Sequence, residues 1–578
     1  MQTIQGEKYL WKLPSVEQDK VFKLASSYNM SLPLVHTLCT RGMVTKEAID
    51  SFLFTSFSKD VAHPSLMHGA QRAVDRILKA IETGEKILVC GDYDVDGITS
   101  SAMMMECLLP LGAQINFFLP HRVRNGYGLS SKIIKRAAEN DYRVVITVDN
   151  GITAFEPAQE ALKLGIDLII TDHHRSHGKT PEAYAVINPN QEVCEYPFKG
   201  LAGVGVAFKL LWFLYEQLDK ELPDKVYELL MLGTIADVVP LEGENRYWVR
   251  HGLEQVRKNE SLAIKVLKEQ GRVSRPKLNS LDVGFCLTPQ INALGRLEDA
   301  REGVAFLIGK DHTTTARVGK ILYELNQARR KIERTILDEI VARVESGEVD
   351  PDKGDVIVIG GRGWKPGVIG LVASRLVGLY GKPTLVFHLT KDGKAKGSCR
   401  SIDAFNIFDA LAENKDLIDQ FGGHSQAAGL SMPAKNLDEL RERLSKKIKE
   451  TLNADDLAQK IIIDAPLNLS DMTQTFTHDM ALLEPFGHRN PQPTFWIKDV
   501  VLVKPPTLLK ELHPKCTIFL DGVIKPLIFF NRPELFDLLT KWGDRPFHVA
   551  ANVTQNFWQG RSSIELIGVD IAWPEGLV

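Results

Sequence analysis

The sequence has 578 residues, of which 44% are hydrophobic and 25% charged, with a formal net charge of −3. This length exceeds what one hydrophobic core supports, so several domains are expected, and the composition is typical of a globular protein. The chain has no apolar run of membrane-spanning length, no signal-peptide pattern at its start and no Cys-x-x-Cys pair among seven cysteines. We therefore expect a cytoplasmic protein without a cysteine-based zinc or disulfide framework. The near-neutral charge neither indicates nor excludes nucleic-acid binding, because a basic groove can be offset by acidic side chains elsewhere.

The first 60 residues carry helical patterns, at 21–28 and 46–53 among other places, and no residue to which chemistry can be assigned. A further amphipathic helix is expected over 66–82. It leads into the first buried strand of the chain.

The most informative stretch is a short apolar run, 86–90, followed by aspartates at alternate positions and then by a helical pattern. The aspartates are Asp92, Asp94 and Asp96. Residues two apart in an extended segment share a face, so at least two carboxylates can converge on one point, where a divalent ion would offset their repulsion. Taken alone, the stretch fits a solvated acidic loop equally well.

The same pattern recurs twice downstream. A strand over 143–148 ends in Asp149-Asn-Gly, and a strand over 167–171 ends in Asp172-His173-His174. Strands alternating with helices predict a parallel, doubly wound sheet with its ligand crevice beyond the carboxyl ends of the strands. Three strand ends that bring acids and imidazoles to one crevice favour a metal site over capping aspartates.

These motifs, together with the stretch Gly233-Thr-Ile-Ala-Asp-Val-Val-Pro, resemble those of the DHH phosphoesterases. Within that superfamily the sequence is similar to the RecJ family, bacterial exonucleases that act on single-stranded DNA from 5′ to 3′. The resemblance extends from about residue 52 through the C-terminal region. It implies phosphodiester hydrolysis with two Mn²⁺ or Mg²⁺ ions, release of 5′-mononucleotides and a role in DNA repair and recombination. Single-stranded DNA is the implied partner, with a single-strand-binding protein and a helicase as candidates, and we expect a monomer.

The implied metal ligands are four carboxylates and one imidazole, a set that suits Mn²⁺ or Mg²⁺ better than zinc. They are Asp94, Asp96, Asp149, His173 and Asp237. Asp149, central in the sheet, is the candidate to bridge two ions. Asp237 stands in an apolar helix and, without the resemblance, would be interpreted as a capping aspartate.

Two residues are assigned to catalysis, His174 and Asp92. Adjacent histidines cannot easily both face one ion from an extended backbone, so His174 is expected to contact the scissile phosphate. Relatives in the superfamily carry histidine where this chain has Cys90. Asp92 is expected either to fill that gap at the first ion or to hold a ligand in place. The glycines at 203 and 205, which begin a later helix, are interpreted as structural.

The sequence says less about the residues that contact the substrate than about the metal ligands. The loop 121–129 presents Arg122, Arg124 and the glycine-flanked Tyr127, which is either an ordinary loop or a phosphate contact. The motif 288–298 resembles one in RecJ and keeps Arg296, but Gln290 stands where the family usually has arginine. The terminal-phosphate pocket is therefore expected to be weakened or rebuilt.

The second lobe begins with a strand over 355–360, and its Lys365 stands where the family often has histidine. Ser398 and Arg400 on one strand face could grip a phosphate together. A glycine-rich turn over 421–429 is expected to enter a helix and to cradle an anion with its amides beside His424.

From about residue 455 the pattern changes to short β-type runs, which predict a small barrel of the OB type. Aromatic residues there are stacking candidates, although aromatics in strands more often belong to a core. The candidates are Trp496, Phe529, Phe530 and Trp558. Arg489 replaces a usual glycine, which implies a different turn geometry.

The predicted fold is α/β: a Rossmann-like DHH catalytic domain with a parallel sheet, a second α/β lobe joined by a long helix, and an OB-like β-barrel. The expected boundaries are an N-terminal helical segment, the catalytic domain, the connecting helix, the second lobe and the barrel, at 1–60, 61–310, 311–346, 347–453 and 454–578. Two alternatives stay open. A DHH phosphoesterase of short oligonucleotides or cyclic dinucleotides would lack the barrel, and a non-enzymatic single-strand DNA clamp would have lost its acids.

Overall fold

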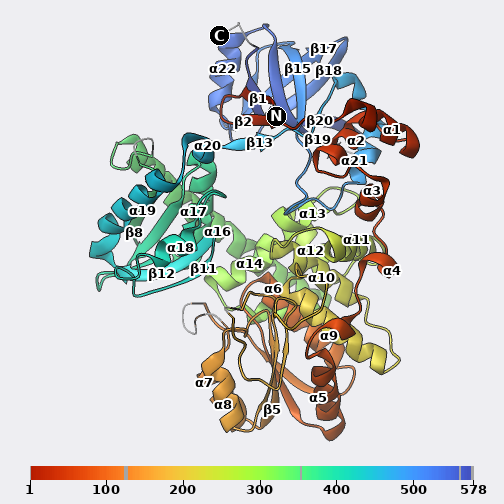
Figure 1. The fold of residues 1–578 in the computed structure, drawn as a ribbon, viewed down its shortest axis with the longest axis vertical. Coiled ribbons are helices and arrows are strands. Elements are labelled where there is room, and N and C mark those ends of the chain that lie inside the picture. Colours follow the sequence, from red (N-terminus) through yellow and green to blue (C-terminus); the bar gives the residue numbers. More distant parts are fainter. Residues whose placement is uncertain are drawn as a thin grey trace. The chain divides into compact units, whose positions relative to one another are not determined.

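The computed structural model describes residues 2–122, 126, 128–176, 178–351, 354–558 and 561–574. It divides the chain into two compact units, one formed by residues 1–323 with 461–578 and the other by residues 324–460. The mixed α/β architecture, the parallel sheet and the C-terminal barrel confirm the predicted fold class (Figure 1).

The first unit contains a five-stranded sheet in the order β4-β3-β5-β6-β7, in which every neighbouring pair is parallel. Its strands are β3 (Lys86–Cys90), β4 (Gln114–Phe118), β5 (Tyr142–Val148), β6 (Asp167–Thr171) and β7 (Ala185–Ile187). The strands read as continuous apolar runs because helices cover both faces of the sheet. Helices α7 (Ser131–Glu139) and α8 (Phe155–Lys163) lie on one face, and α5 (Ala70–Thr83) and α9 (Gly203–Gln217) lie on the other (Figure 1).

Two further helices position the site. Helix α6 (Val95–Leu108) follows β3, and α10 (Lys225–Ala236) packs against it. Gly233 allows this close approach, because a Cβ there would lie 2.4 Å from Thr99 Oγ1 and 3.0 Å from Asp96 Oδ1. The C-terminal end of α10 therefore lies beside the acidic end of the sheet.

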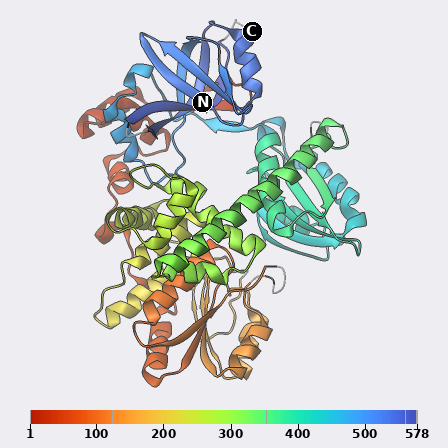
Figure 2. The same ribbon diagram turned by 180° about the vertical axis from the view of Figure 1, so that it is seen from behind.

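The second unit is built on a sheet in the order β11-β12-β10-β9-β8. Its strands are β8 (Ile357–Arg362), β9 (Thr384–Leu389), β10 (Lys394–Arg400), β11 (Gln420–His424) and β12 (Ala427–Pro433). Helix α16 (His312–Glu345), the predicted connecting helix, is continuous (Figure 2). The expectation that residues 421–429 form a turn entering a helix is wrong. They form the β11–β12 hairpin, whose second strand pairs with β10 along its whole length.

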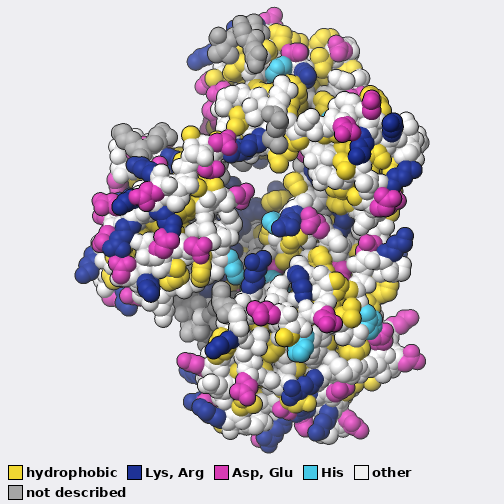
Figure 3. Space-filling model, in the orientation of Figure 1, with side chains coloured by type: hydrophobic (Ala, Val, Ile, Leu, Met, Phe, Trp, Pro, Cys, Tyr) yellow, Lys and Arg dark blue, Asp and Glu magenta, His cyan; other side chains and the backbone are white. Residues whose placement is uncertain are grey.

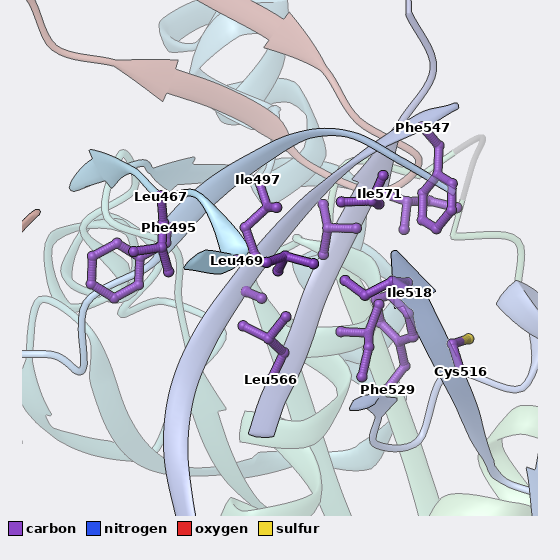
Figure 4. Packing of buried hydrophobic residues seen from close by; sticks show 14 of the residues in the cluster. Leu467, Leu469, Phe495, Ile497, Cys516, Ile518, Phe529, Phe547, Leu566 and Ile571 are labelled. Carbon is purple, nitrogen blue, oxygen red and sulfur yellow. The ribbon is translucent and has the colours of Figure 1, made fainter. Parts of the chain in front are cut away.

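The C-terminal part of the first unit contains a closed five-stranded barrel, in which β15 pairs with both β19 and β17. The strands are β15 (Phe495–Leu502), β17 (His513–Leu520), β18 (Val523–Phe529), β19 (Phe547–Trp558) and β20 (Arg561–Ala572). Alternate residues point inward and form one apolar core (Figure 4). Phe529, a stacking candidate from sequence, belongs to this core and is fully buried.

The N-terminal segment is attached to the barrel. Strands β1 (Gln2–Gln5) and β2 (Leu10–Leu13), which the helical patterns did not predict, form a sheet with β13 (Lys460–Ile462). The indole of Trp11, fully buried, donates a 2.9 Å hydrogen bond to Asp570 Oδ2 on β20. Helices α1 (Gln18–Tyr28), α2 (Leu32–Thr40) and α3 (Lys46–Leu53) follow.

Acidic and basic side chains are interspersed on the face of the molecule shown in Figure 3, in keeping with the small net charge. Over the described ranges, none of the helices has both the length and the apolarity needed to span a membrane.

Candidate metal centre

The carboxyl ends of three adjacent parallel strands deliver the acidic residues to one edge of the sheet. Cys90 of β3 is paired with Thr147 of β5, and Val148 is paired with Thr171 of β6. The aspartates that follow these strands, Asp92, Asp149 and Asp172, are all buried. The strand register therefore accounts for the convergence predicted from the sequence.

Asp149 adopts a strained backbone conformation at the point where β5 ends. Its φ angle is +62°, in the left-handed region, and Gly151 follows with a φ angle of +114°. Such a conformation in a non-glycine residue costs on the order of 1–3 kcal/mol and is concentrated at functional sites. The amide of Asn150 stabilises the turn by donating to the backbone oxygens of Cys90 (3.0 Å) and Val148 (2.9 Å).

Asp96 is held by the N-terminus of helix α9. Its two carboxylate oxygens accept hydrogen bonds from the backbone amides of Gly203 (2.6 Å) and Val204 (2.8 Å). The amides and the helix dipole favour the charged carboxylate. Burial and the nearby charge of Asp237 oppose this and raise the pKa of Asp96 to about 7. The glycine interpreted as structural from the sequence thus contacts a candidate ligand.

His173 lies between two candidate carboxylates. Its Nε2 is 3.2 Å from Asp149 Oδ1 and 3.5 Å from Asp237 Oδ2. Burial and the charge of His174 lower the pKa of His173, which favours the neutral imidazole that binds metal ions. Burial and the charge of Asp94 raise the pKa of Asp237 to about 8.

Three buried side-chain atoms in this cluster, each able to bind a metal ion, have no hydrogen-bond partner among the residues that the structure describes. They are Asp92 Oδ1, His173 Nε2 and Asp237 Oδ2. A buried carboxylate oxygen without a partner is costly, and a divalent cation satisfies such atoms. The donor chemistry, carboxylate oxygens with one imidazole, fits Mn²⁺ or Mg²⁺.

The ligand atoms form three overlapping groups, each with all atoms within 4.8 Å of one another. The groups are Asp149 with His173 and His174, Asp96 with His173 and Asp237, and Asp92 with Asp94 and Asp149. The structure thus brings together all five sequence-predicted ligands and both predicted catalytic residues. Asp149 belongs to two of the groups.

His174 is held as a cation by Asp172. Its Nδ1 lies 2.7 Å from Asp172 Oδ1, and that carboxylate also accepts from the backbone amides of Ile152, His173 and His174. Burial alone would lower the pKa of His174, but the hydrogen bond and charge of Asp172 outweigh it and raise the pKa to about 9. From the sequence, Asp172 was only the first residue of the Asp172-His173-His174 motif, and no contact was predicted for it. The arrangement presents a positively charged imidazole beside the acidic cluster.

Arg122 and Arg296 lie near the cluster. The Arg122 guanidinium stacks over the Tyr93 ring, 4.0 Å from its centroid, and Nε donates to the Gly295 carbonyl at 3.1 Å. Positive charge from both arginines acts on Tyr93. The other loop candidates, Arg124 and Tyr127, lie outside the described residues.

The second unit brings Ser398 and Arg400 together on one face of β10, with Arg400 Nη1 3.2 Å from Ser398 Oγ. Gly370 on helix α17 (Pro366–Tyr380) packs directly against both, since a Cβ there would lie 2.8 Å from Ser398 Oγ. His424 ends β11 and is exposed. The residue after it, Ser425, accepts a 2.9 Å hydrogen bond at its carbonyl from the amide of Ile407, the first residue of helix α18 (Ile407–Ala412).

Four positions at which the sequence departs from related families have distinct environments. Cys90 is buried in an apolar cluster, where desolvation raises its pKa to about 12, and it belongs to none of the three ligand groups found among the described residues. Gln290 is buried, and its amide donates to the carbonyls of Leu267 and Cys286. Lys365 is exposed. Arg489 has a φ of +58°, in the left-handed region that usually favours glycine.

A Rossmann-like sheet with aspartates and a histidine pair at its carboxyl ends defines a metal-dependent phosphoesterase of the DHH class. Family models agree: residues 86–234 match "DHH family, N-terminal domain", residues 353–450 match "DHHA1 domain", and residues 463–570 match "RecJ OB domain".

Comparison with individual proteins identifies the family within the DHH class. The single-stranded-DNA-specific exonuclease RecJ of Bacillus subtilis is 36% identical over 99% of this chain and 72% of the relative. RecJ of Salmonella typhimurium is 34% identical over 88% of this chain and 91% of the relative. The crystal structure of Thermus thermophilus RecJ with Mn²⁺ superposes with a TM-score of 0.82 at 26% identity, covering 98% of this chain and 80% of that one. The chain belongs to the RecJ family.

Proposed function

We propose that this chain is an exonuclease that degrades single-stranded DNA from its 5′ end and releases 5′-mononucleotides, in DNA repair and recombination. The observation that carries the proposal is the set of buried ligand atoms of Asp92, His173 and Asp237 that have no hydrogen-bond partner among the described residues, at the DHH-type end of the sheet. RecJ relatives named single-stranded-DNA-specific exonucleases support the substrate.

Five side chains would hold the metal ions, with Asp149 shared between two of them. The five are Asp94, Asp96, Asp149, His173 and Asp237. When bound, Mn²⁺ or Mg²⁺ supplies a nucleophilic hydroxide at neutral pH and offsets charge on the reacting phosphate. Similar RecJ structures contain Mn²⁺ or Mg²⁺.

The residues of the chain orient the ligands and the substrate. The amides of Gly203 and Val204 fix both oxygens of Asp96 and so restrict the direction of its remaining lone pairs. The imidazolium of His174, held by Asp172, would bind a nonbridging oxygen of the scissile phosphate and counter the charge that develops in the transition state. Arg122 and Arg296 would bind phosphates on the same side of the sheet.

Polarity would follow from where the terminal phosphate binds. Ser398 and Arg400 offer a hydroxyl and a guanidinium side by side, a combination suited to a phosphate dianion, with His424 as a further contact. After each cleavage the next nucleotide carries a new 5′ phosphate, so the same residues would bind it again.

The remaining assignments belong to the same proposal. Catalysis would reside in residues 61–310, terminal-phosphate binding in 347–453 and strand binding in the barrel of 454–578. The protein would act as a cytoplasmic monomer together with a single-strand-binding protein and a helicase. Tyr127 and Arg124 would contact the strand near the site.

The test is digestion of a labelled strand, free or annealed into a blunt duplex, in the presence of Mn²⁺. The wild-type protein should degrade the single strand and leave the duplex largely intact. Asp149→Asn should slow digestion by about 100-fold or more, because it removes the shared ligand. Asp219→Asn, at an exposed carboxylate, serves as the control. Comparable cleavage of the duplex, or turnover of dinucleotides alone, would refute the proposal.

A further inference from the structure

Tyr93 is neither a candidate metal ligand nor a predicted substrate contact, and its ring supports a guanidinium beside the metal centre. It stands between Asp92 and Asp94 in the loop that joins β3 to α6. The Arg122 guanidinium lies over its ring, with 4.0 Å between Arg122 Cζ and the ring centroid. An arginine on the face of an aromatic ring is attracted by the ring quadrupole, and its planar set of N–H donors stays free to bind at the edge.

The register of the parallel sheet brings Arg122 to this loop. Strand β4, which precedes Arg122, pairs with β3 so that Phe118 lies opposite Cys90. The two chain segments therefore leave the sheet side by side. Arg122 Nε also donates a 3.1 Å hydrogen bond to the carbonyl of Gly295, near the end of helix α14 (Thr288–Leu297). One ring and one carbonyl thus fix the guanidinium.

Two neighbouring helices hold the backbone around Tyr93. A Cβ on Gly97 would lie 2.5 Å from the amide nitrogen and from the carbonyl oxygen of Asp92, so the first turn of α6 packs directly on the loop. A Cβ on Gly295 would lie 1.9 Å from the Tyr93 carbonyl oxygen, so the end of α14 packs on the loop as well. The ring therefore has a fixed base from which to orient Arg122.

The two contacts leave most of the Arg122 donors available. A guanidinium has five N–H groups, and the Gly295 carbonyl accepts from one of them. Burial and the charge of Asp94 raise the pKa of Asp92, and the positive charge of Arg122 opposes that rise. Even so, no carboxylate of the described residues forms an ion pair with Arg122. A guanidinium held by a ring and a neutral carbonyl keeps its charge for an anion that binds beside the acidic cluster.

We propose that Tyr93 is a positioning residue for the exonuclease reaction: its ring sets the orientation in which Arg122 binds a phosphate of the single strand. Tyr93 also belongs to the loop of Asp92 and Asp94, so the arginine and the acidic residues share one support. The charge of Arg296, the second candidate phosphate contact, acts on Tyr93 too. The inference rests on the proposed function, because it takes a phosphate of the strand as the ligand of Arg122.

Three single variants, one double variant and a control test the proposal. Tyr93→Leu removes the ring but keeps an apolar side chain in this partly buried position, Tyr93→Phe keeps the ring face, and Arg122→Gln removes the charge. The double variant combines Tyr93→Leu with Arg122→Gln. Tyr184→Leu is the matched control, because the Arg72 guanidinium lies 4.4 Å from the centroid of the Tyr184 ring. Tyr184 immediately precedes β7, at the amino ends of the strands and away from the metal centre.

The measurements are kcat and KM for a 5′-phosphorylated thymidine oligonucleotide with Mn²⁺, and the Mn²⁺ concentration dependence of digestion by each variant. Tyr93→Leu should raise KM about fivefold or more with little change in kcat, and Tyr93→Phe should restore most of the wild-type KM. In the double variant, Tyr93→Leu should add nothing to the loss caused by Arg122→Gln, because the ring acts through Arg122. Tyr184→Leu should give the wild-type KM, and all variants should show the wild-type Mn²⁺ dependence.

Additive losses in the double variant would overturn the proposal, because Tyr93 would then act without Arg122. An unchanged KM in Tyr93→Leu or in Arg122→Gln would overturn it as well. Equal losses in Tyr93→Phe and Tyr93→Leu would assign the effect to the hydroxyl, and a raised Mn²⁺ requirement in Tyr93→Leu would assign it to the metal-binding loop; either result would also refute the positioning role. A wild-type protein that does not hydrolyse the oligonucleotide would instead refute the proposed function.

Discussion

Gly203 is the position where a single methyl group should disable the metal centre. A Cβ at Gly203 would lie 2.5 Å from Asp149 Cβ, 2.7 Å from Asp149 Oδ1 and 2.8 Å from Asp149 Cα. Real Cβ atoms do not approach other atoms this closely, so either Asp149 or the start of α9 must move. Asp149 is already in a strained backbone conformation and is buried, which leaves it little room to adjust.

Movement of α9 would in turn break the hydrogen bond from the Gly203 amide to Asp96 Oδ2. A hydrogen bond to a charged group contributes about 1.5–3 kcal/mol, and a comparable loss of transition-state stabilisation corresponds to a rate decrease of about 10- to 150-fold. We expect Gly203→Ala to lower the Mn²⁺-dependent exonuclease rate by about 100-fold or more, since it disturbs two ligands at once.

Gly205→Ala is the matched control in the same helix. A Cβ there would meet only the side chain of Leu201, at 3.3 Å, which can shift by a few tenths of an ångström. Both variants should give the far-ultraviolet circular dichroism of the wild type. If Gly203→Ala binds Mn²⁺ and degrades single strands at the wild-type rate, the account of how Asp96 and Asp149 are positioned is wrong.

Three further predictions follow from the site. Asp172→Asn should remove the charge that keeps His174 protonated, so the pKa of His174 should fall from about 9 toward about 6.5. The alkaline limb of the pH profile of kcat/KM should then move to lower pH. An unshifted limb would show that the reaction does not need the positive charge of His174. Without metal, burial raises the pKa of Asp237 to about 8, so its folded state binds more protons than its unfolded state between about pH 4 and 8 and stability falls as pH rises. The Tm in EDTA should therefore decline across that window, less steeply in Asp237→Asn, and Mn²⁺ should restore it at pH 8; equal slopes in the two proteins would contradict this. Cys90→Ala should lower Tm, because the thiol is buried in an apolar cluster, and should leave the Mn²⁺ concentration dependence of digestion unchanged. A tenfold rise in the Mn²⁺ concentration needed for digestion would indicate that Cys90 is a metal ligand.

The sequence predicts the parts of the site that depend on local pattern. Each of β3, β5 and β6 is an apolar run followed within two residues by an acid, and the parallel register of the sheet then brings Asp92, Asp149 and Asp172 together. Alternation along β10 likewise placed Ser398 beside Arg400.

The features that sequence reasoning missed depend on contacts between distant segments. The Gly203 amide donates to Asp96, 107 positions earlier in the chain, and the sequence around either residue does not predict this contact. The N-terminal hairpin depends on Asp570, 559 positions from Trp11, and its strands are too short to stand out. The stretch 421–429 is rich in alanine and glycine, and pairing with β10 decides that it forms strands.

The direction in which the protein digests a DNA strand is the measurement that tests the central claim most directly. One long single strand is labelled at its 5′ end in one sample and at its 3′ end in another, and both are digested with Mn²⁺. The proposed 5′-to-3′ exonuclease should release the 5′ label early as a mononucleotide, while the 3′-labelled strand shortens slowly through a ladder of intermediates. Early release of the 3′ label, or internal fragments from both substrates, would contradict the account.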